Sequence, residues 1–145
     1  MATKLQGLIA KALRTESRNP SLRSEAEQTF LWQVKHATTI ADPVAAYRFH
    51  LERKWEFDFA WPEVAIAVEI EGGIWRGRGF GSKTANNPGG AHSHPLQILR
   101  DIEKYNEAAR MGWRIFRFTT DMVKSGEAIA FLGTLGLPAK HIDAA

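Results

Sequence analysis

The chain contains no cysteine among its 145 residues. This absence excludes disulfide bonds, a thiolate nucleophile and cysteine-based zinc sites, and it agrees with a reducing compartment. Any bound metal ion must therefore be held by oxygen atoms or by imidazole nitrogen.

Long apolar runs are also missing. No segment approaches the ~20 apolar residues that a membrane span needs. Residues 1–13 are basic and mildly amphipathic, but they lack the apolar stretch and the cleavage site of a secretory signal. We therefore expect a soluble, cytoplasmic protein with no membrane partner.

The composition favours one globular domain. With 145 residues and 44% hydrophobic content, the chain is long enough for one core and short for two, so we predict a single domain over residues 1–145. The formal net charge of +3 weakly favours an anionic partner.

The apolar spacing predicts a mixed order of helices and strands. A helix is expected over 22–37, three strands over 46–51, 54–61 and 64–71, a long glycine-rich loop over 72–95, a helix from Pro95 to Gly112, a strand over 113–119 and an interrupted helix from Thr120 to about Leu135. In the helix from Pro95, Ile98, Ile102, Tyr105 and Ala109 are expected to face the core. This order predicts an α/β or α+β three-layer sandwich around one mixed sheet, with an αβββαβ core and a C-terminal helix.

Acidic residues mark two of the predicted strands. Side chains alternate along a strand, so Val64, Ile66, Val68 and Ile70 share one face, and Glu69 and Glu71 leave the other. Asp58 lies on the preceding strand, where a meander brings it alongside Glu69. Three converging carboxylates repel one another unless a cation lies among them. The alternative is a solvated strand end with Asp58 paired to an arginine.

A site of oxygen ligands alone suits Mg²⁺ or Mn²⁺, which bind through one or two carboxylates plus substrate phosphate. Hydrolysis of phosphodiesters is the reaction that such a site supports, because the metal polarises the phosphoryl oxygen and lowers the pKa of a bound water.

Five phrases of the sequence resemble one superfamily. They are YRFH (47–50), DFAWPE (58–63), EIEGGIW (69–75), DIEKYN (101–106) and GWRIFRF (112–118). In this order, over roughly residues 24–124, they resemble the PD-(D/E)XK nucleases, and most closely the small phage and bacterial endonucleases related to the very-short-patch repair (Vsr-like) nucleases. The resemblance implies a restriction-endonuclease-like fold and a magnesium-dependent endodeoxyribonuclease, in a bacterial cell or a phage-infected host.

The resemblance also implies roles for single residues. Asp58, Glu69 and the backbone carbonyl of Ile70 would bind the metal. Glu71 stands where the superfamily often has lysine, and this departure leaves open which group activates the attacking water. Lys104 could supply the ammonium from the following helix, or it could be a solvated lysine.

Two loop histidines are further candidates for the general base, because relatives carry a histidine before this helix and imidazole suits that role near neutral pH. His92, nine residues before Asp101, has the expected spacing, and His94 is the alternative. The general base therefore stays open among His92, His94, Lys104 and Glu71.

Three more residues have two interpretations each. Glu27 resembles the helix carboxylate that orients a metal-bound water, but it also completes a capping box with Ser24. Asp101 and Lys104, one helical turn apart, are expected to pair and to orient the loop. Arg117 is expected to hold either Glu71 or a phosphate.

The glycine-rich loop carries basic and aromatic residues that could contact DNA, namely Trp75, Arg76, Arg78, Phe80 and Lys83. The sequence therefore predicts a DNA endonuclease that is structure-selective or weakly sequence-specific. The alternative is a catalytically degenerate nuclease fold that binds nucleic acid. Cutting both strands with one site per chain would be simplest for a homodimer.

Overall fold

The computed structural model describes residues 24–72 and 93–141, and for residues 93–95 it describes the backbone alone. Its elements, in chain order, are α2 (Glu25–Ala37), β1 (Val44–Arg48), β2 (Glu56–Trp61), the 3₁₀ turn η2 (Pro62–Val64), β3 (Ile66–Glu71), α3 (Ser93–Arg110), β4 (Arg114–Thr119), α4 (Thr120–Lys124) and α5 (Glu127–Leu132). The described part of the chain is thus a mixed α and β fold.

Four strands form one mixed sheet in the order β1-β2-β3-β4. The first three are antiparallel neighbours, as the short polar links predicted, whereas β3 and β4 are parallel. A parallel pair needs a long crossover, and α3 lies within it. The predicted αβββαβ order is confirmed, and the predicted C-terminal helix consists of α4 and α5.

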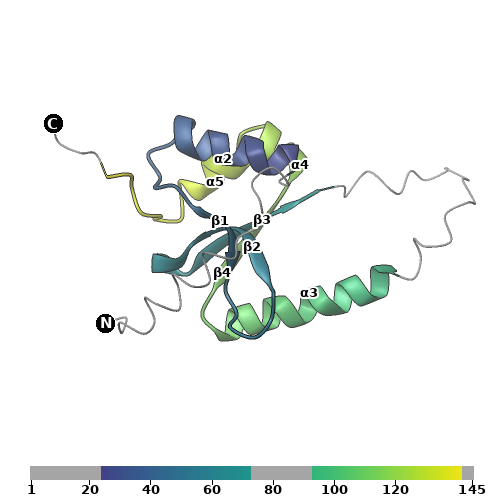
Figure 1. Cartoon of the computed structure of the whole chain (residues 1–145). Helices are drawn as coiled ribbons and strands as arrows, with labels where there is room; N and C mark the ends of the chain where they lie inside the picture. Colours follow the sequence, from purple (N-terminus) through teal and green to yellow (C-terminus); the bar gives the residue numbers. More distant parts are fainter. Residues whose placement is uncertain (1–23, 73–92, 142–145) are drawn as a thin grey trace, which may run out of the picture.

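Helices cover both faces of the sheet (Figure 1). On one face, α2, α4 and α5 bury the larger core, to which β3 contributes Ile66, Val68 and Ile70. On the other face lies α3 with a smaller aromatic cluster that includes Tyr47, Phe49, Phe57, Ala67 and Ala108. The alternation predicted for residues 66–71 is therefore confirmed.

The expected core face of α3 is wrong. Ile98 and Ile102 are 45% and 50% exposed, and Ala109 is exposed as well. Ala108 is the fully buried residue, and Lys104 and Tyr105 are half-buried beside it. With 18 residues, α3 is about 27 Å long, whereas strands of five or six residues span about 17–20 Å, so the first half of α3 extends beyond the sheet (Figure 1).

The expected start of β3 is also corrected. Val64 belongs to η2 and is 40% exposed, so it does not share the face of Ile66. Ala65 then takes the left-handed conformation, with φ at 52°, before the strand begins. Pro62 explains the turn, because its ring fixes φ near the helical value at the first position.

Local signals set the helix ends. The Ser24 hydroxyl accepts a hydrogen bond from the N–H of Glu27 and caps α2, as the sequence predicted. Gly112, the predicted stop of α3, has φ at 92°, and Gly126, with φ at 81°, separates α4 from α5. Glycine reaches these positive φ values at little cost.

The C-terminal segment is fastened to the end of α2. Ile40 and Ala139 form an isolated antiparallel bridge. The Lys140 ammonium donates to the carbonyls of Val34, Lys35 and Thr38. These carbonyls lie at the negative end of the helix dipole, so the cation there stabilises α2.

In the described residues, no helix is both long enough and apolar enough to cross a membrane.

Replacing Lys140 tests this fastening. We expect Lys140→Met to lower the free energy of unfolding by about 1–2 kcal/mol, because three carbonyls lose a charged donor while the aliphatic stem is kept. Denaturant unfolding of this variant beside Lys124→Met, an exposed lysine on α4, makes the comparison. Equal stability of the two variants would contradict the expectation.

Candidate functional site

Asp58 and Glu69 meet where the pairing of β2 with β3 ends. Phe59 is opposite Val68, so the next position of the register sets Asp58 against Glu69. There the Asp58 carboxylate enters the space between the strands, and its Oδ2 accepts a hydrogen bond of 2.8 Å from the N–H of Ile70. The Asp58 carboxylate thus accepts the hydrogen bond that a backbone carbonyl of β2 would otherwise accept from β3. The prediction that Asp58 lies alongside Glu69 is confirmed.

Glu69 is paired with Lys104 from α3. The Lys104 ammonium donates to Glu69 Oε1, and the two side chains are only 14% and 11% exposed, respectively. The ammonium also lies 5.5 Å from the centre of the Phe57 ring and 5.4 Å from that of Tyr105. Lys104 is therefore not a solvated helix lysine, and it places a positive charge on a predicted metal ligand.

Burial makes Glu69 a weak acid in the folded chain. Its pKa is raised from 4.5 to about 7, mainly because burial removes the hydration of the carboxylate and in smaller part because of the negative charges of Asp58 and Glu71. The Lys104 charge and hydrogen bond act in the opposite direction, but burial has the larger effect. Glu69 therefore exchanges its proton near neutral pH, as functional carboxylates often do.

Glu71 is paired with Arg117 at the next outward position of β3. Arg117 Nε donates to Glu71 Oε1 at 2.6 Å, so the first of the two expectations for Arg117 is confirmed. The guanidinium carbon lies 4.9 Å from the centre of the Tyr105 ring. Burial, followed by the charge of Glu69, raises the pKa of Tyr105, which keeps its hydroxyl protonated.

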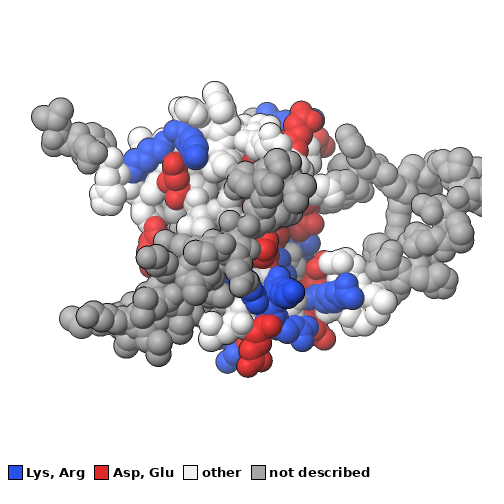
Figure 2. All heavy atoms as spheres, viewed as in Figure 1, with Lys and Arg blue, Asp and Glu red and all other residues white. Residues whose placement is uncertain are grey.

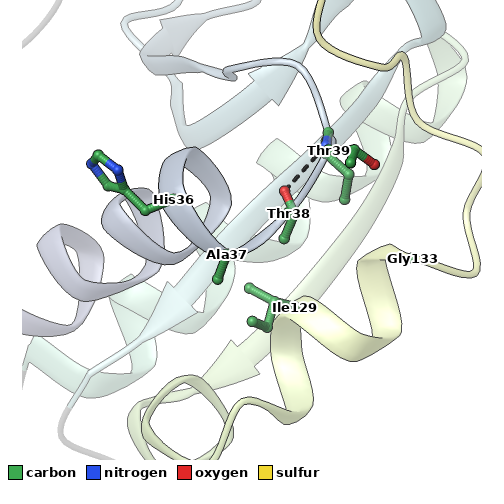
Figure 3. Close-up of a pocket in the computed structure, with 7 residues that line it drawn as sticks. His36, Ala37, Thr38, Thr39, Ile129 and Gly133 are labelled. Carbon is green, nitrogen blue, oxygen red and sulfur yellow. Dashed lines mark hydrogen bonds between the residues drawn. The ribbon is translucent and has the colours of Figure 1, made fainter.

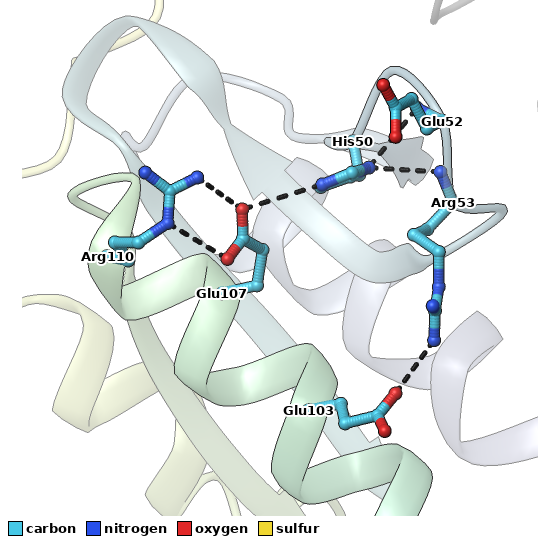
Figure 4. Close-up of polar contacts among 6 residues, drawn as sticks. All are labelled: His50, Glu52, Arg53, Glu103, Glu107 and Arg110. Carbon is cyan, nitrogen blue, oxygen red and sulfur yellow. Dashed lines mark hydrogen bonds and ion pairs between the residues drawn. The ribbon is translucent and has the colours of Figure 1, made fainter.

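A polar network holds α3 against the β1-β2 connection (Figure 4). The Nδ1 of His50 accepts from the N–H groups of Glu52 and Arg53, and its Nε2 faces Glu107 at 3.5 Å. The Arg53 guanidinium donates to Glu103 at 2.8 Å. These contacts lie on the same helix as Lys104, so they help to set its position at Glu69.

The other predicted site residues have different contacts or lie outside the described part of the chain. Glu27 is buried at the start of α2, where its N–H donates to the Ser24 hydroxyl, as the capping interpretation predicts. Its carboxylate accepts from the same hydroxyl. Asp101 accepts from Gln97, whereas Lys104 contacts Glu69, so the expected pairing of Asp101 with Lys104 is wrong. The remaining candidates lie outside the described side chains: His92, His94, Trp75, Arg76, Arg78, Phe80 and Lys83.

Tyr105 belongs to the site, although the sequence analysis did not name it as a site residue. Its apolar spacing suggested a core position, yet it contacts both basic residues of the site. The signal was present in Asp101, which lies one turn before Tyr105 on the same helix face, where a buried helix would have an apolar residue.

The donor set fits a hard divalent cation. Within residues 24–72 and 93–141, no group of three or more His, Asp or Glu side chains is close enough to hold a metal ion. Mg²⁺, however, needs only one or two carboxylates when substrate phosphate and water complete its coordination. Asp58 and Glu69 supply two carboxylates. If the metal bound Glu69 Oε1, the Lys104 ammonium would have to move away from that oxygen.

Charges of both signs gather over this part of the molecule. In Figure 2, lysine and arginine side chains alternate with acidic ones over the region of α3. Such a mixed surface gives local attraction for phosphate without a broad basic face.

A separate hollow lies at the C-terminal end of α2 (Figure 3). It has a volume of about 530 Å³, and its lining includes His36, Thr38, Ile129 and Gly133. The Thr38 hydroxyl there is used within the chain, since it donates to Val34 and accepts from Ile40. Among the described residues, no carboxylate lines this hollow, which distinguishes it from the acid cluster.

Comparison with known proteins gives two distant relatives. Both are uncharacterized proteins of Mycobacterium tuberculosis, from strains CDC 1551 and H37Rv, and each is 25% identical over 127 residues. The match covers 86% of this chain and 38% of each relative, so the chain spans about two fifths of their length. No protein-family profile matches, and no solved structure matches.

The raised pKa of Glu69 predicts a pH-dependent stability. The folded chain keeps this proton between about pH 4.5 and 7 while the unfolded chain releases it, so ionising Glu69 destabilises the fold as pH rises through this window. The stability of Glu69→Gln relative to the wild type should therefore increase by roughly 1–3 kcal/mol over that range and level off above it. Denaturant unfolding at several pH values measures the difference, and a constant difference would contradict the assignment.

Proposed function

We propose that this chain is a magnesium-dependent DNA endonuclease with a restriction-endonuclease-like fold of the PD-(D/E)XK type. The observation that carries the proposal is the meeting of Asp58 with the buried Glu69 on adjacent strands, at the end of their backbone pairing. The αβββαβ order and the two helical layers support it. The likeness to Vsr-like endonucleases rests on the five sequence motifs.

Each polar residue of the cluster has a role in this proposal. Asp58 and Glu69, with the backbone carbonyl of Ile70, hold Mg²⁺ or Mn²⁺, and the bound metal supplies Lewis acidity at the scissile phosphate. Arg117 is placed to bind a neighbouring phosphate oxygen when it exchanges from Glu71. The substrate is DNA, cut with structural selectivity or weak sequence preference.

Lys104 is the group best supported as the replacement for the superfamily's lysine. Its ammonium contacts Glu69, although it comes from α3 and not from the strand position that Glu71 occupies. There it can donate to the attacking water or to the phosphate. His92, His94 and Glu71 remain the other candidates for the general base.

A second function is favoured by the same contacts. Asp58, Glu69 and Glu71 each have a partner within the chain, namely the Ile70 amide, Lys104 and Arg117. Their charges are therefore partly compensated without a metal ion. A nuclease fold that binds nucleic acid but does not cleave it would keep such a network, and it would bind DNA equally well with or without divalent metal.

Removing the proposed ligands tests the enzyme. Asp58→Ala and Glu69→Ala should each lower the rate of plasmid cleavage in Mg²⁺ or Mn²⁺ by at least about 100-fold, because ligand loss costs at least as much as loss of a group that supports a ligand. The matched control is Glu63→Ala, an exposed glutamate of η2, which should cut like the wild type. A wild type that binds plasmid, branched and single-stranded DNA but cuts none of them in either metal would refute the nuclease.

Replacing Lys104 separates its role from that of the acids. Lys104→Met should cut at least about ten-fold more slowly, because the transition state loses a positioned ammonium. Its affinity for Mn²⁺ should be equal or higher, since the metal no longer competes with an ammonium for Glu69. Single-turnover cleavage and calorimetric Mn²⁺ titration measure the two effects, with Lys124→Met as control. An unchanged cleavage rate would exclude a catalytic role for Lys104.

A further inference from the structure

Two adjoining hollows follow the seam between α3 and β4. Each has a volume of about 350 Å³, and both are lined by Tyr105 and Arg117. Single ligand pockets of proteins have volumes of about 300–1,000 Å³. Because β4 is the last strand of the described sheet, the seam lies at the sheet's edge.

The seam borders the acid cluster. Tyr105 lines both hollows, and its ring also lies 5.4 Å from the ammonium that contacts Glu69. Arg117 lines both hollows as well and binds Glu71. A phosphate held at the acid cluster would therefore have its own nucleotide, or the next one, beside the Tyr105 ring.

The hollow that extends toward the start of α3, called the outer hollow below, is lined by groups of the kinds that recognise a nucleobase. Tyr105 adds an aromatic ring to the lining, Ile98 and Ile102 add apolar side chains, and Asp101 and Asn106 add polar groups. Proteins bind unpaired bases by stacking them on aromatic rings and by hydrogen bonding to their Watson–Crick edges. The half-exposed isoleucines of α3, which cover no core, have a use in such a site.

We infer that this outer hollow is a nucleobase subsite, in which Tyr105 stacks on an unpaired base next to the phosphate at the acid cluster and Asp101 reads the base edge. This inference adds a base-binding subsite to the proposed function, and it rests on that function because the phosphate is assumed to bind at the acid cluster. One carboxylate oxygen of Asp101 accepts from Gln97, and the other is directed to the base in this arrangement. A carboxylate accepts hydrogen bonds only, so the subsite favours bases with an exocyclic amino group on the Watson–Crick edge, namely cytosine, adenine and guanine. It disfavours thymine, whose single N3–H donor lies between two carbonyl oxygens.

Binding of short single strands without metal tests the subsite apart from cleavage. In EDTA, fluorescence anisotropy should show tighter binding of oligo-dC and oligo-dA than of oligo-dT. Tyr105→Ala should weaken all three by about five-fold or more, whereas Tyr105→Phe keeps the ring and should bind like the wild type. Asp101→Asn should remove the preference against oligo-dT. The control, Trp32→Ala, changes an exposed aromatic residue on the other face of the sheet.

A crosslinking measurement uses the wild type alone, so its result does not depend on whether the Tyr105 and Asp101 variants fold. Irradiation of the wild type with an oligonucleotide that carries 5-iodocytosine, followed by peptide mapping, should place the adduct on Tyr105. An adduct confined to residues outside the seam would overturn the inference. So would unchanged affinity in Tyr105→Ala, or no binding of any single strand by the wild type.

The outcomes distinguish the subsite from the nuclease. A wild type that never cuts DNA, yet binds single strands through Tyr105, retains the subsite and refutes the endonuclease. A wild type that cuts DNA while Tyr105→Ala binds single strands with unchanged affinity retains the endonuclease and refutes the subsite.

Discussion

The contact between Lys104 and Glu69 is the constraint on which the arrangement of the site depends. Glu69 is buried beside two other acids, and without a nearby cation their repulsion would force it to stay protonated or to move. Lys104 supplies that cation from α3, which covers the face of the sheet from which Glu69 projects, so the position of α3 and the charge state of the acids are coupled. Whatever shifts α3 also changes the chemistry at Asp58 and Glu69.

The position of α3 and the charge of the acids are coupled because polar contacts help to attach α3 to the sheet. Among its described side chains, the helix contributes one fully buried residue, Ala108, to the core. Polar contacts also hold it, namely those of Lys104 with Glu69 and of Glu103 and Glu107 with the β1-β2 connection. Polar contacts depend on geometry and are weaker at an exposed surface than apolar burial. Two hollows remain along the seam between α3 and β4, next to the residues that contact the acids.

The strands and the acid pair could be predicted from sequence, whereas the orientation of α3 could not. Asp58 and Glu69 lie on strands whose alternation fixes the face of each side chain, and short links make the strands neighbours. The apolar spacing of Ile98 and Ile102 does identify a helix face, but it does not say whether the sheet is wide enough to cover it. Pairing of Lys104 with Glu69 instead of Asp101 likewise depends on the distance between layers. Val64 was misplaced because a turn beginning at Pro62 delays the strand.

The burial of charge at this site is itself an argument about function. Replacing a buried ion pair by well-packed apolar residues is often neutral or stabilising. Ala67, two positions earlier on the same face, shows that an apolar residue is accommodated against α3. Stability alone therefore does not explain Glu69 and Lys104. A carboxylate whose pKa is raised to about 7, next to a second carboxylate and a displaceable ammonium, is poised to exchange its proton or its cation near neutral pH. In the proposed nuclease, a divalent metal would replace that proton or ammonium on Glu69, and this exchange is the argument for cleavage over a degenerate fold.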